Sequence, residues 1–151
     1  MTAVIQRVYN ATVYADGEFS GKIDKGLYIL LGVSKGDTEE DARLLAEKIS
    51  KLRIFSDENG KMNLSVLDIG GGVLVVSNFT LNANYAHGNR PDYLESAPPT
   101  EANALYESFL SLMRVRVQTV ASGKFGADMR TDMSTDGPVT IVMHSSVLKK
   151  K

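Results

Sequence analysis

Runs rich in β-branched and aromatic residues make up most of the chain, and two segments with helical spacing interrupt them at separate places. Residues 2–14 and 18–23 form the first two runs, and Asp16-Gly17 between them is a strong hairpin signal. The apolar runs 26–33 and 73–79 predict buried strands. Further strands are predicted at residues 115–120, 125–134 and 139–147. This distribution of strands and helices predicts an α+β fold.

Two helices are predicted, one on each side of the second apolar run. The first is expected to begin at Asp37 as N-cap, with Glu40 three residues later as in a capping box, and to end near Arg53. Thr100 is a suitable N-cap for the second. Each helix has one apolar face, formed by Ala42, Leu45, Ala46, Ile49 and Leu52 in the first and by Ala102, Leu105, Phe109, Leu112 and Met113 in the second.

Two connecting segments stand out between these elements. Gly70-Gly71-Gly72 precedes an apolar strand, so a hairpin turn is favoured over a phosphate cradle, which would lie between a strand and a helix. Residues 81–100 form a long polar connection that contains Pro91, Pro98 and Pro99. Loops of this length are uncommon in compact domains and are often functional.

The length of 151 residues fits a single domain, which we assign to residues 1–148, followed by a basic tail at residues 149–151. The chain contains no Cys, which excludes disulfides, thiolate nucleophiles and Cys-based zinc sites and fits a cytoplasmic location. No apolar run approaches the roughly 20 residues of a membrane span, and no secretory signal is visible, so no membrane partner is expected.

The formal net charge of −1 argues against a protein that grips a long stretch of nucleic acid. It allows a local footprint, such as capture of the end of one strand. The sequence alone does not choose among the candidates for phosphate contact, which are Arg53, Arg90, Arg114, Arg116, Lys124, Arg130 and the Lys tail.

The two histidines, His87 and His144, lie in unrelated segments, and neither a G-x-S-x-G nor an H-E-x-x-H motif is present. A Ser-His-Asp triad is therefore not expected. A metal site built from scattered carboxylates stays open as an alternative, although no metal ligand is assigned and no cofactor is predicted. The remaining features are a polar segment that ends the second apolar run, beginning at Ser77, and a Gly137-Pro138 pair before a predicted strand. These features are compatible with a hydrolase but do not identify its substrate.

These two segments resemble the active-site motifs of the D-aminoacyl-tRNA deacylases. They read Ser77-Asn78-Phe79-Thr80-Leu81 and Asp136-Gly137-Pro138-Val139-Thr140-Ile141. Further similar stretches follow in the family's order along almost the whole chain, at residues 3–8, 26–33, 37–42, 48–55, 60–65, 88–91, 97–99 and 123–129. The chain departs from the family pattern where Asn78 replaces Gln, Asn82 replaces Tyr and Thr135 replaces Asn.

The resemblance implies a mixed, mainly antiparallel and barrel-like sheet with two helices, assembled as an intertwined homodimer with an active site at each subunit junction. It implies hydrolysis of the ester of D-aminoacyl-tRNA, whose acceptor end is the partner. A cis Gly137-Pro138 bond would place its carbonyls in the partner's pocket and exclude L-amino acids by steric repulsion. Glycyl-tRNA, which has no side chain to exclude, would also be cleaved.

The resemblance also implies roles for individual residues, and it implies chemistry without a metal. The backbone N–H groups of Phe79 and Thr80 would stabilise the oxyanion, with the Thr80 hydroxyl as an alternative nucleophile, and Ser77 would hold the substrate's amino group or adenosine. Substrate-binding residues would be Asn78, Leu81, Gly137, Pro138, Val139 and Thr140. Two alternatives stay open: an editing hydrolase with altered specificity, and a non-catalytic module that binds the tRNA end.

Overall fold

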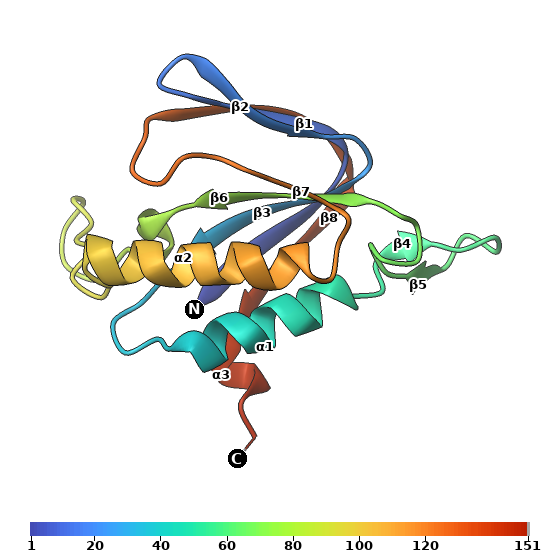
Figure 1. Cartoon of the computed structure of the whole chain (residues 1–151). Helices are drawn as coiled ribbons and strands as arrows, with labels where there is room; N and C mark the ends of the chain where they lie inside the picture. The colour runs from blue at the N-terminus through green and yellow to red at the C-terminus, as the bar shows by residue number, and fades with distance from the viewer. Residues whose placement is uncertain (151) are drawn as a thin grey trace.

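One long strand organises the sheet. In the computed structural model, which describes residues 1–150, β1 (Thr2–Ala15) pairs antiparallel with β8 (Met129–His144) along its whole length. On its other edge, β1 pairs antiparallel with β3 (Gly26–Gly32) through its first half and with β2 (Glu18–Ile23) through its second half. Figure 1 shows how β1, β2 and β8 curl away from the flatter part of the sheet.

The predicted hairpin between β1 and β2 is confirmed. Ala15 pairs with Glu18, and the two residues between them, Asp16 and Gly17, have φ angles of 49° and 81°. Positive φ at both central positions is what the tight turns of β-hairpins require.

Two parallel strands extend the sheet beyond β3. β6 (Gly72–Ser77) pairs with β3, and β7 (Thr119–Ser122) pairs with β6. The predicted hairpin turn at the three glycines is wrong, because the strand that precedes them, β5 (Met62–Leu64), pairs with β4 (Phe55–Ser56) and not with β6. A Cβ added at Gly26 would clash with the backbone of Gly72, so β3 and β6 approach closely through glycine.

The sheet nearly closes on itself. The Ser20 hydroxyl of β2 donates to the Ser122 carbonyl of β7 at 2.9 Å, which joins the two ends of the strand order. The interior of this barrel is filled by Val8, Ala11, Val13, Ile23, Tyr28, Leu74 and Val76. A mixed and barrel-like sheet in a single domain is thus confirmed, with antiparallel pairing around β1 and parallel pairing beyond β3.

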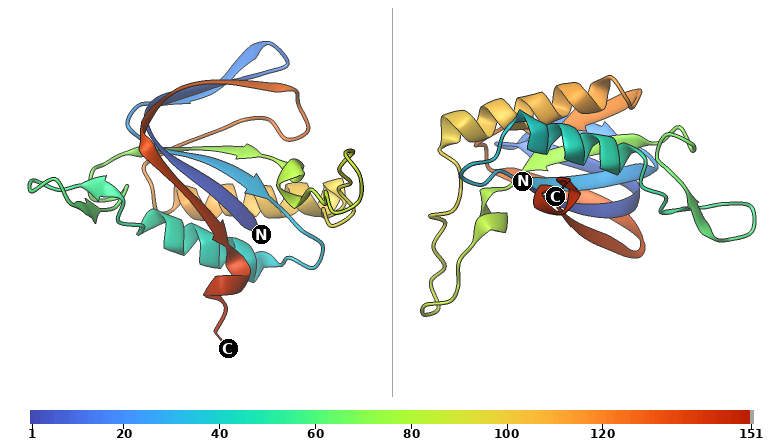
Figure 2. Two further views of the ribbon diagram at one scale, coloured as in Figure 1. Left: turned by 180° about the vertical axis from the view of Figure 1, so that it is seen from behind. Right: turned by 90° about the horizontal axis from the view of Figure 1, so that it is seen from below.

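Both predicted helices are present and cover one face of the sheet, as the views in Figures 1 and 2 show. α1 (Glu39–Ser50) begins one residue later than expected: Thr38 is the N-cap, and Asp41 completes its capping box. α2 (Pro99–Arg114) begins at Pro99, a residue type that needs no N–H partner in the first turn. Their apolar faces meet β1, β3 and β6 in the larger buried core.

Several predicted strands have different limits. The predicted strands at 125–134 and 139–147 are one strand, β8, which continues through a cis Gly137-Pro138 peptide, so the predicted cis bond is confirmed. The strand predicted at 115–120 begins only at Thr119, because residues 115–118 form the turn that follows α2. The shorter elements are β4 (Phe55–Ser56), β5 (Met62–Leu64), the 3-10 helix η1 (Phe79–Asn82) and α3 (Ser145–Leu148).

A buried carboxylate joins α1 to α3. Asp41, whose side chain is 2% exposed, accepts a hydrogen bond from the Ser145 hydroxyl at 2.7 Å and one from the Thr38 N–H at 2.8 Å. The Lys149 ammonium lies 2.9 Å from Oδ1 and 3.1 Å from Oδ2 of this carboxylate, so the first residue of the predicted tail is anchored. Lys151, the last residue of that tail, lies outside the described residues. No helix within residues 1–150 combines the length and apolarity of a membrane span.

The charge of Asp41 follows from these contacts. Burial opposes ionisation and raises the pKa of the carboxyl group, but the hydrogen bonds from Ser145, Lys149 and Thr38 outweigh it. The pKa of Asp41 is therefore held well below its ordinary value, and the group is a buried carboxylate at neutral pH.

Candidate functional site

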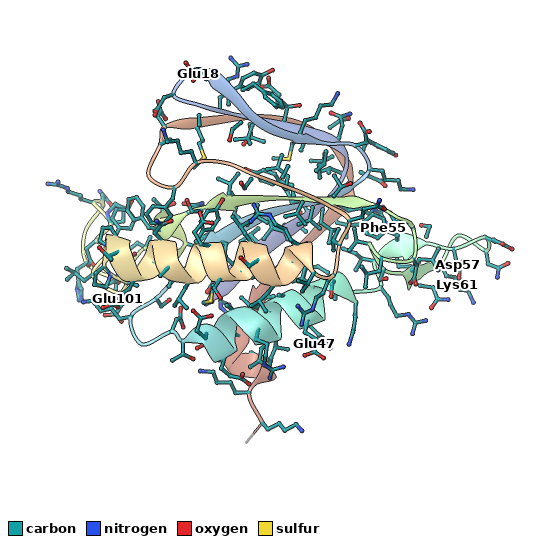
Figure 3. The ribbon with its side chains drawn as sticks, in the orientation of Figure 1. Glu18, Glu47, Phe55, Asp57, Lys61 and Glu101 are labelled. Atoms are coloured by element: carbon teal, nitrogen blue, oxygen red, sulfur yellow. The ribbon has the colours of Figure 1, made fainter. Side chains whose placement is uncertain are left out.

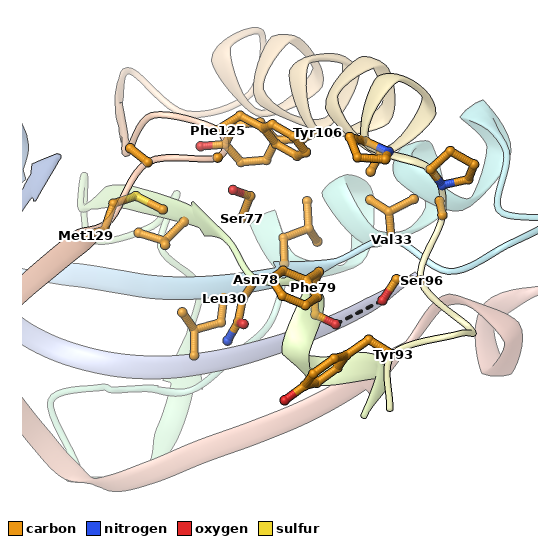
Figure 4. A pocket seen from close by; sticks show the side chains of 18 of the residues that line it. Leu30, Val33, Ser77, Asn78, Phe79, Tyr93, Ser96, Tyr106, Phe125 and Met129 are labelled. Atoms are coloured by element: carbon orange, nitrogen blue, oxygen red, sulfur yellow. Dashed lines mark hydrogen bonds between the residues drawn. The ribbon is translucent and has the colours of Figure 1, made fainter. Parts of the chain in front are cut away.

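A cavity of about 810 Å³ opens where the parallel strands β3 and β6 end. Its walls come from these strand ends, from η1, from the loop before α2, from α2 itself, and from the start of β8 together with the segment that leads into it (Figure 4). Most of the lining is apolar or aromatic, including Leu30, Val33, Phe79, Tyr106 and Phe125. An apolar cavity of this size with a few polar groups at its mouth is typical of a small-molecule site.

The polar groups at the strand end are held by local backbone geometry. Ser77 is the last residue of β6, and Figure 4 shows its side chain directed into the cavity. Asn78 has an extended backbone, donates its N–H to the Leu31 carbonyl at 2.8 Å and caps η1. Its Oδ1 accepts from the Thr80 N–H at 3.2 Å and from the Thr80 hydroxyl at 2.5 Å. The chain therefore turns sharply at the mouth of the cavity.

The first motif divides into two parts. Ser77, Asn78 and Phe79 line the cavity, whereas Thr80 and Leu81 do not. The Thr80 N–H is already bonded to Asn78, and within residues 1–150 the Phe79 N–H has no acceptor. Of the two backbone groups expected at an oxyanion, only that of Phe79 is free to receive one.

The cavity lining contains no His, Asp, Glu, Lys or Arg among the described residues. Its buried phenols are poor bases. Burial raises the pKa of Tyr106 to about 12, and its hydroxyl donates to the Val75 carbonyl at 3.0 Å. Burial also raises the pKa of Tyr28, although a hydrogen bond with Thr131 opposes the shift. General base catalysis by a side chain is therefore disfavoured here.

The loop before α2 completes the site. The Ser96 hydroxyl donates to the Phe79 carbonyl at 3.2 Å, as Figure 4 shows. The Tyr93 ring packs edge-on against the Phe79 ring, with 5.0 Å between the two ring centroids. Asn82, the last residue of η1 and the position where the family has Tyr, donates to the Val33 carbonyl just after β3 at 2.9 Å and to the Ser96 hydroxyl at 3.4 Å. The long polar loop was predicted to be functional, but the sequence did not identify Tyr93 and Ser96.

Within one chain, the second motif does not line this cavity. Ser77 pairs with Leu31, Leu31 with Ala3 and Ala3 with Met143, so the end of β8 lies three strand spacings from Ser77, about 14 Å along the sheet. The start of β8 reaches the cavity through Met129 and Thr131, whereas Gly137 and Pro138, midway along the strand, are exposed.

Arg7 of β1 holds the residue before this pair. Its guanidinium donates to the Asp136 carbonyl and forms a salt bridge with the Asp136 carboxylate, both at 3.1 Å, and it also donates to the Ile54 carbonyl at 2.8 Å. Thr140 is held by Gln6, whose amide donates to its hydroxyl at 3.3 Å. Neither Val139 nor Thr140 lines the cavity of its own chain.

The remaining candidates stay outside the cavity. His144 makes a 3.0 Å hydrogen bond with Thr2, and His87 lies exposed in the loop before α2. Within residues 1–150, no group of three or more His, Cys, Asp or Glu side chains is arranged to hold a metal ion.

Comparison with known proteins links this geometry to a family. A family model described as D-Tyr-tRNA(Tyr) deacylase matches residues 4–144. A protein named D-aminoacyl-tRNA deacylase from Thermosipho africanus is 54% identical over 145 residues, which cover 96% of this chain and 97% of the relative. One of the same name from Thermotoga petrophila is 52% identical over 148 residues, covering 98% and 99%.

Solved structures agree in fold. A c-Myc DNA unwinding element binding protein has a TM-score of 0.89 at 41% identity, over 95% of this chain and 98% of the other. A probable eukaryotic D-amino acid tRNA deacylase has a TM-score of 0.81 at 15% identity, over 95% and 99%, and shows likeness of fold alone. The family match over almost the whole chain and the identity of half the residues with its relatives show that this chain belongs to the D-Tyr-tRNA(Tyr) deacylase family.

Proposed function

We propose that this protein hydrolyses the ester that joins a D-amino acid to the terminal adenosine of tRNA, and that it acts in the cytoplasm as a homodimer. The domain that does so spans residues 1–148. The observation that carries the proposal is the Phe79 N–H, which has no acceptor within residues 1–150 and lies at the mouth of an apolar cavity whose described lining contains no side-chain base. The family membership and the names of the relatives support it.

The proposed reaction relies on a backbone group and on the RNA more than on side chains of the protein. Water adds to the ester carbonyl, the Phe79 N–H donates to the developing oxyanion, and the carbon–oxygen bond to the ribose then breaks. The proton lost by the water passes to the departing ribose oxygen, with the neighbouring 2′-hydroxyl of the RNA assisting. An ester is activated enough for positioning and oxyanion stabilisation to supply the acceleration. Ser77 holds the substrate's amino group or its adenosine.

In the proposed dimer, the second motif of the partner subunit selects D-amino acids. Gly137 and Pro138 are exposed and do not line their own chain's cavity. In the proposed dimer, their carbonyls enter the partner's cavity where an L side chain would lie. The pocket then discriminates by excluding the wrong substrate. Glycine has no side chain to exclude, so its ester also enters.

Incubation of the pure protein with D-tyrosyl-tRNA, L-tyrosyl-tRNA and glycyl-tRNA tests the function. We expect rapid release of D-tyrosine and of glycine, with L-tyrosyl-tRNA left intact, when the esters are followed by acid-precipitable radioactivity. Equal cleavage of the two tyrosyl esters would refute the proposal. A preference for L-alanyl-tRNA would indicate an editing hydrolase of altered specificity, and binding without turnover would indicate a non-catalytic module.

The Thr80 hydroxyl is expected to be dispensable. It donates to the Asn78 side chain and lies outside the cavity lining, so it is poorly placed to attack a bound ester. Thr80→Val removes the hydroxyl and keeps the N–H, and we expect kcat for D-tyrosyl-tRNA to stay within about fivefold of the wild-type value, since one neutral hydrogen bond contributes about 1 kcal/mol. A fall of a thousandfold in single-turnover rates would restore Thr80 as the nucleophile.

A further inference from the structure

A second hollow lies on the surface formed by α1 and the end of α3. It has a volume of about 680 Å³, and Lys or Arg supplies five of its nine lining residues, whereas Glu47 supplies the one acidic group. We call it the basic groove, and its cationic residues are Arg43, Lys48, Lys51, Arg53 and Lys150. Figure 3 shows Glu47 on the side of α1 that faces away from α2.

Internal ion pairs leave part of this positive charge unbalanced. Glu47 forms salt bridges with Arg43 at 3.0 Å and with Lys51 at 3.3 Å. Within residues 1–150, Lys48 and Arg53 form no salt bridge, and both are exposed. Because the whole chain carries a net charge of −1, this concentration of cations in one groove is a local feature.

The basic groove lies beside the second motif and not beside the cavity of its own chain. Arg53 is followed by Ile54, whose carbonyl accepts from the Arg7 guanidinium at 2.8 Å. The same guanidinium donates to the carbonyl of Asp136, the residue before Gly137. A single side chain therefore separates the backbone at the rim of the groove from the backbone of the motif.

We propose that the basic groove binds the phosphate backbone of the tRNA acceptor end whose aminoacyl group occupies the partner subunit's cavity. This inference rests on the proposed function and on the proposed dimer, in which Gly137 and Pro138 reach that cavity. The groove then lies next to the RNA that enters it. Phosphates are the anions that an RNA end presents in a row, and a row of exposed Lys and Arg side chains is what captures them.

The variant Lys48→Gln/Arg53→Gln removes two of the three cations of the basic groove that form no salt bridge within residues 1–150; the third is Lys150. With D-tyrosyl-tRNA, we expect KM to rise about tenfold or more near 0.1 M salt, and the slope of log KM against log salt to fall by roughly 1.4, as expected for two lost phosphate contacts on a single strand. We expect kcat to be unchanged. With the small ester D-tyrosyl-adenosine, which has no phosphate backbone, both constants are expected to match wild type.

A matched control is Lys22→Gln/Lys25→Gln, which removes two exposed Lys side chains, on β2 and on the turn that follows it, outside the basic groove. It should leave KM for the tRNA ester unchanged. RNA binding without turnover can be measured by fluorescence anisotropy. An acceptor-stem RNA hairpin that carries no amino acid is titrated with protein at several salt concentrations. An equal loss of binding in both variants, or no loss in the groove variant, would overturn the inference.

Mixed dimers test whether the groove acts on the partner's cavity. Co-expression of Phe79→Pro chains, which keep the groove, with Lys48→Gln/Arg53→Gln chains, which keep the cavity, is expected to restore about a quarter of the wild-type sites through the heterodimers. These sites should have the wild-type KM. If the mixture is no better than the sum of the two homodimers, the groove does not act on the partner's cavity. If wild type cleaves neither the tRNA ester nor D-tyrosyl-adenosine, the proposed function itself fails.

Discussion

Phe79→Pro is expected to lower kcat for D-tyrosyl-tRNA by about a hundredfold to a thousandfold, the loss measured when one oxyanion donor is removed from a hydrolase. The Phe79 N–H is the only backbone donor of the η1 turn that both lines the cavity and lacks an acceptor within residues 1–150. Proline has no N–H, so the substitution removes this donor. KM should change little, because the oxyanion forms only after the substrate has bound.

The local backbone can accept proline at this position. Asn78, the preceding residue, has φ and ψ of −148° and 94°, an extended conformation that a following proline tolerates. Phe79 is the first residue of η1, where the missing N–H breaks no helical hydrogen bond. The expected loss is therefore chemical and not a consequence of unfolding, which circular dichroism and the thermal unfolding temperature would verify.

Phe79→Ala is the matched control, because it removes the same ring and keeps the N–H. The ring is 58% exposed and contacts Tyr93 at its edge, so we expect a modest rise in KM and a kcat within about tenfold of wild type, since such an aromatic pair contributes about 1 kcal/mol. Equal losses of kcat in the two variants would assign the effect to the ring and refute the backbone role.

Local patterns in the sequence predicted the helices and strands better than they predicted which strands pair with one another. The alternation around Asp16-Gly17 and the apolar faces of α1 and α2 located a hairpin and two helices, because turn chemistry and helical spacing are local properties. The parallel pairing of β6 with β3 was missed. The apolar composition of a buried strand does not reveal which other strand will be its neighbour.

The same distinction holds for the site. The segment that begins at Ser77 was located from the sequence because polar residues end an apolar strand there. Tyr93 and Ser96 were not, since they reach Phe79 only through the tertiary fold of the loop before α2. The sequence also gave no sign that Arg7 would connect Ile54 to Asp136, which brings three distant segments to one edge of the molecule.

Asp41→Asn is expected to lower the free energy of unfolding by about 2–4 kcal/mol at pH 7, the range for loss of a buried and hydrogen-bonded charge. The carboxylate accepts from the Thr38 N–H and the Ser145 hydroxyl and pairs with Lys149. An amide carries no charge for Lys149 and can accept through only one of its two ends, so donors are left unsatisfied in a buried position. Urea unfolding followed by circular dichroism measures the change.

Acid should reduce the difference between wild type and Asp41→Asn. The pKa of Asp41 in the folded protein lies below that of the unfolded chain, so its stabilisation is complete above the unfolded pKa of about 4 and is lost as the pH falls below it. Between pH 5 and pH 3 we expect the difference to shrink by about 1 kcal/mol.

Glu40→Gln is the control for this prediction, because it removes a neighbouring carboxylate on the same turn of α1 whose partner, Arg43, is exposed. Its unfolding free energy should stay close to wild type at both pH values, since exposed ion pairs are screened by solvent. Equal losses in the two variants would show that the buried network around Asp41 contributes no more than a surface pair. A larger loss in Asp41→Asn alone would show that this network joins α1 to α3 and anchors the C-terminal end of β8.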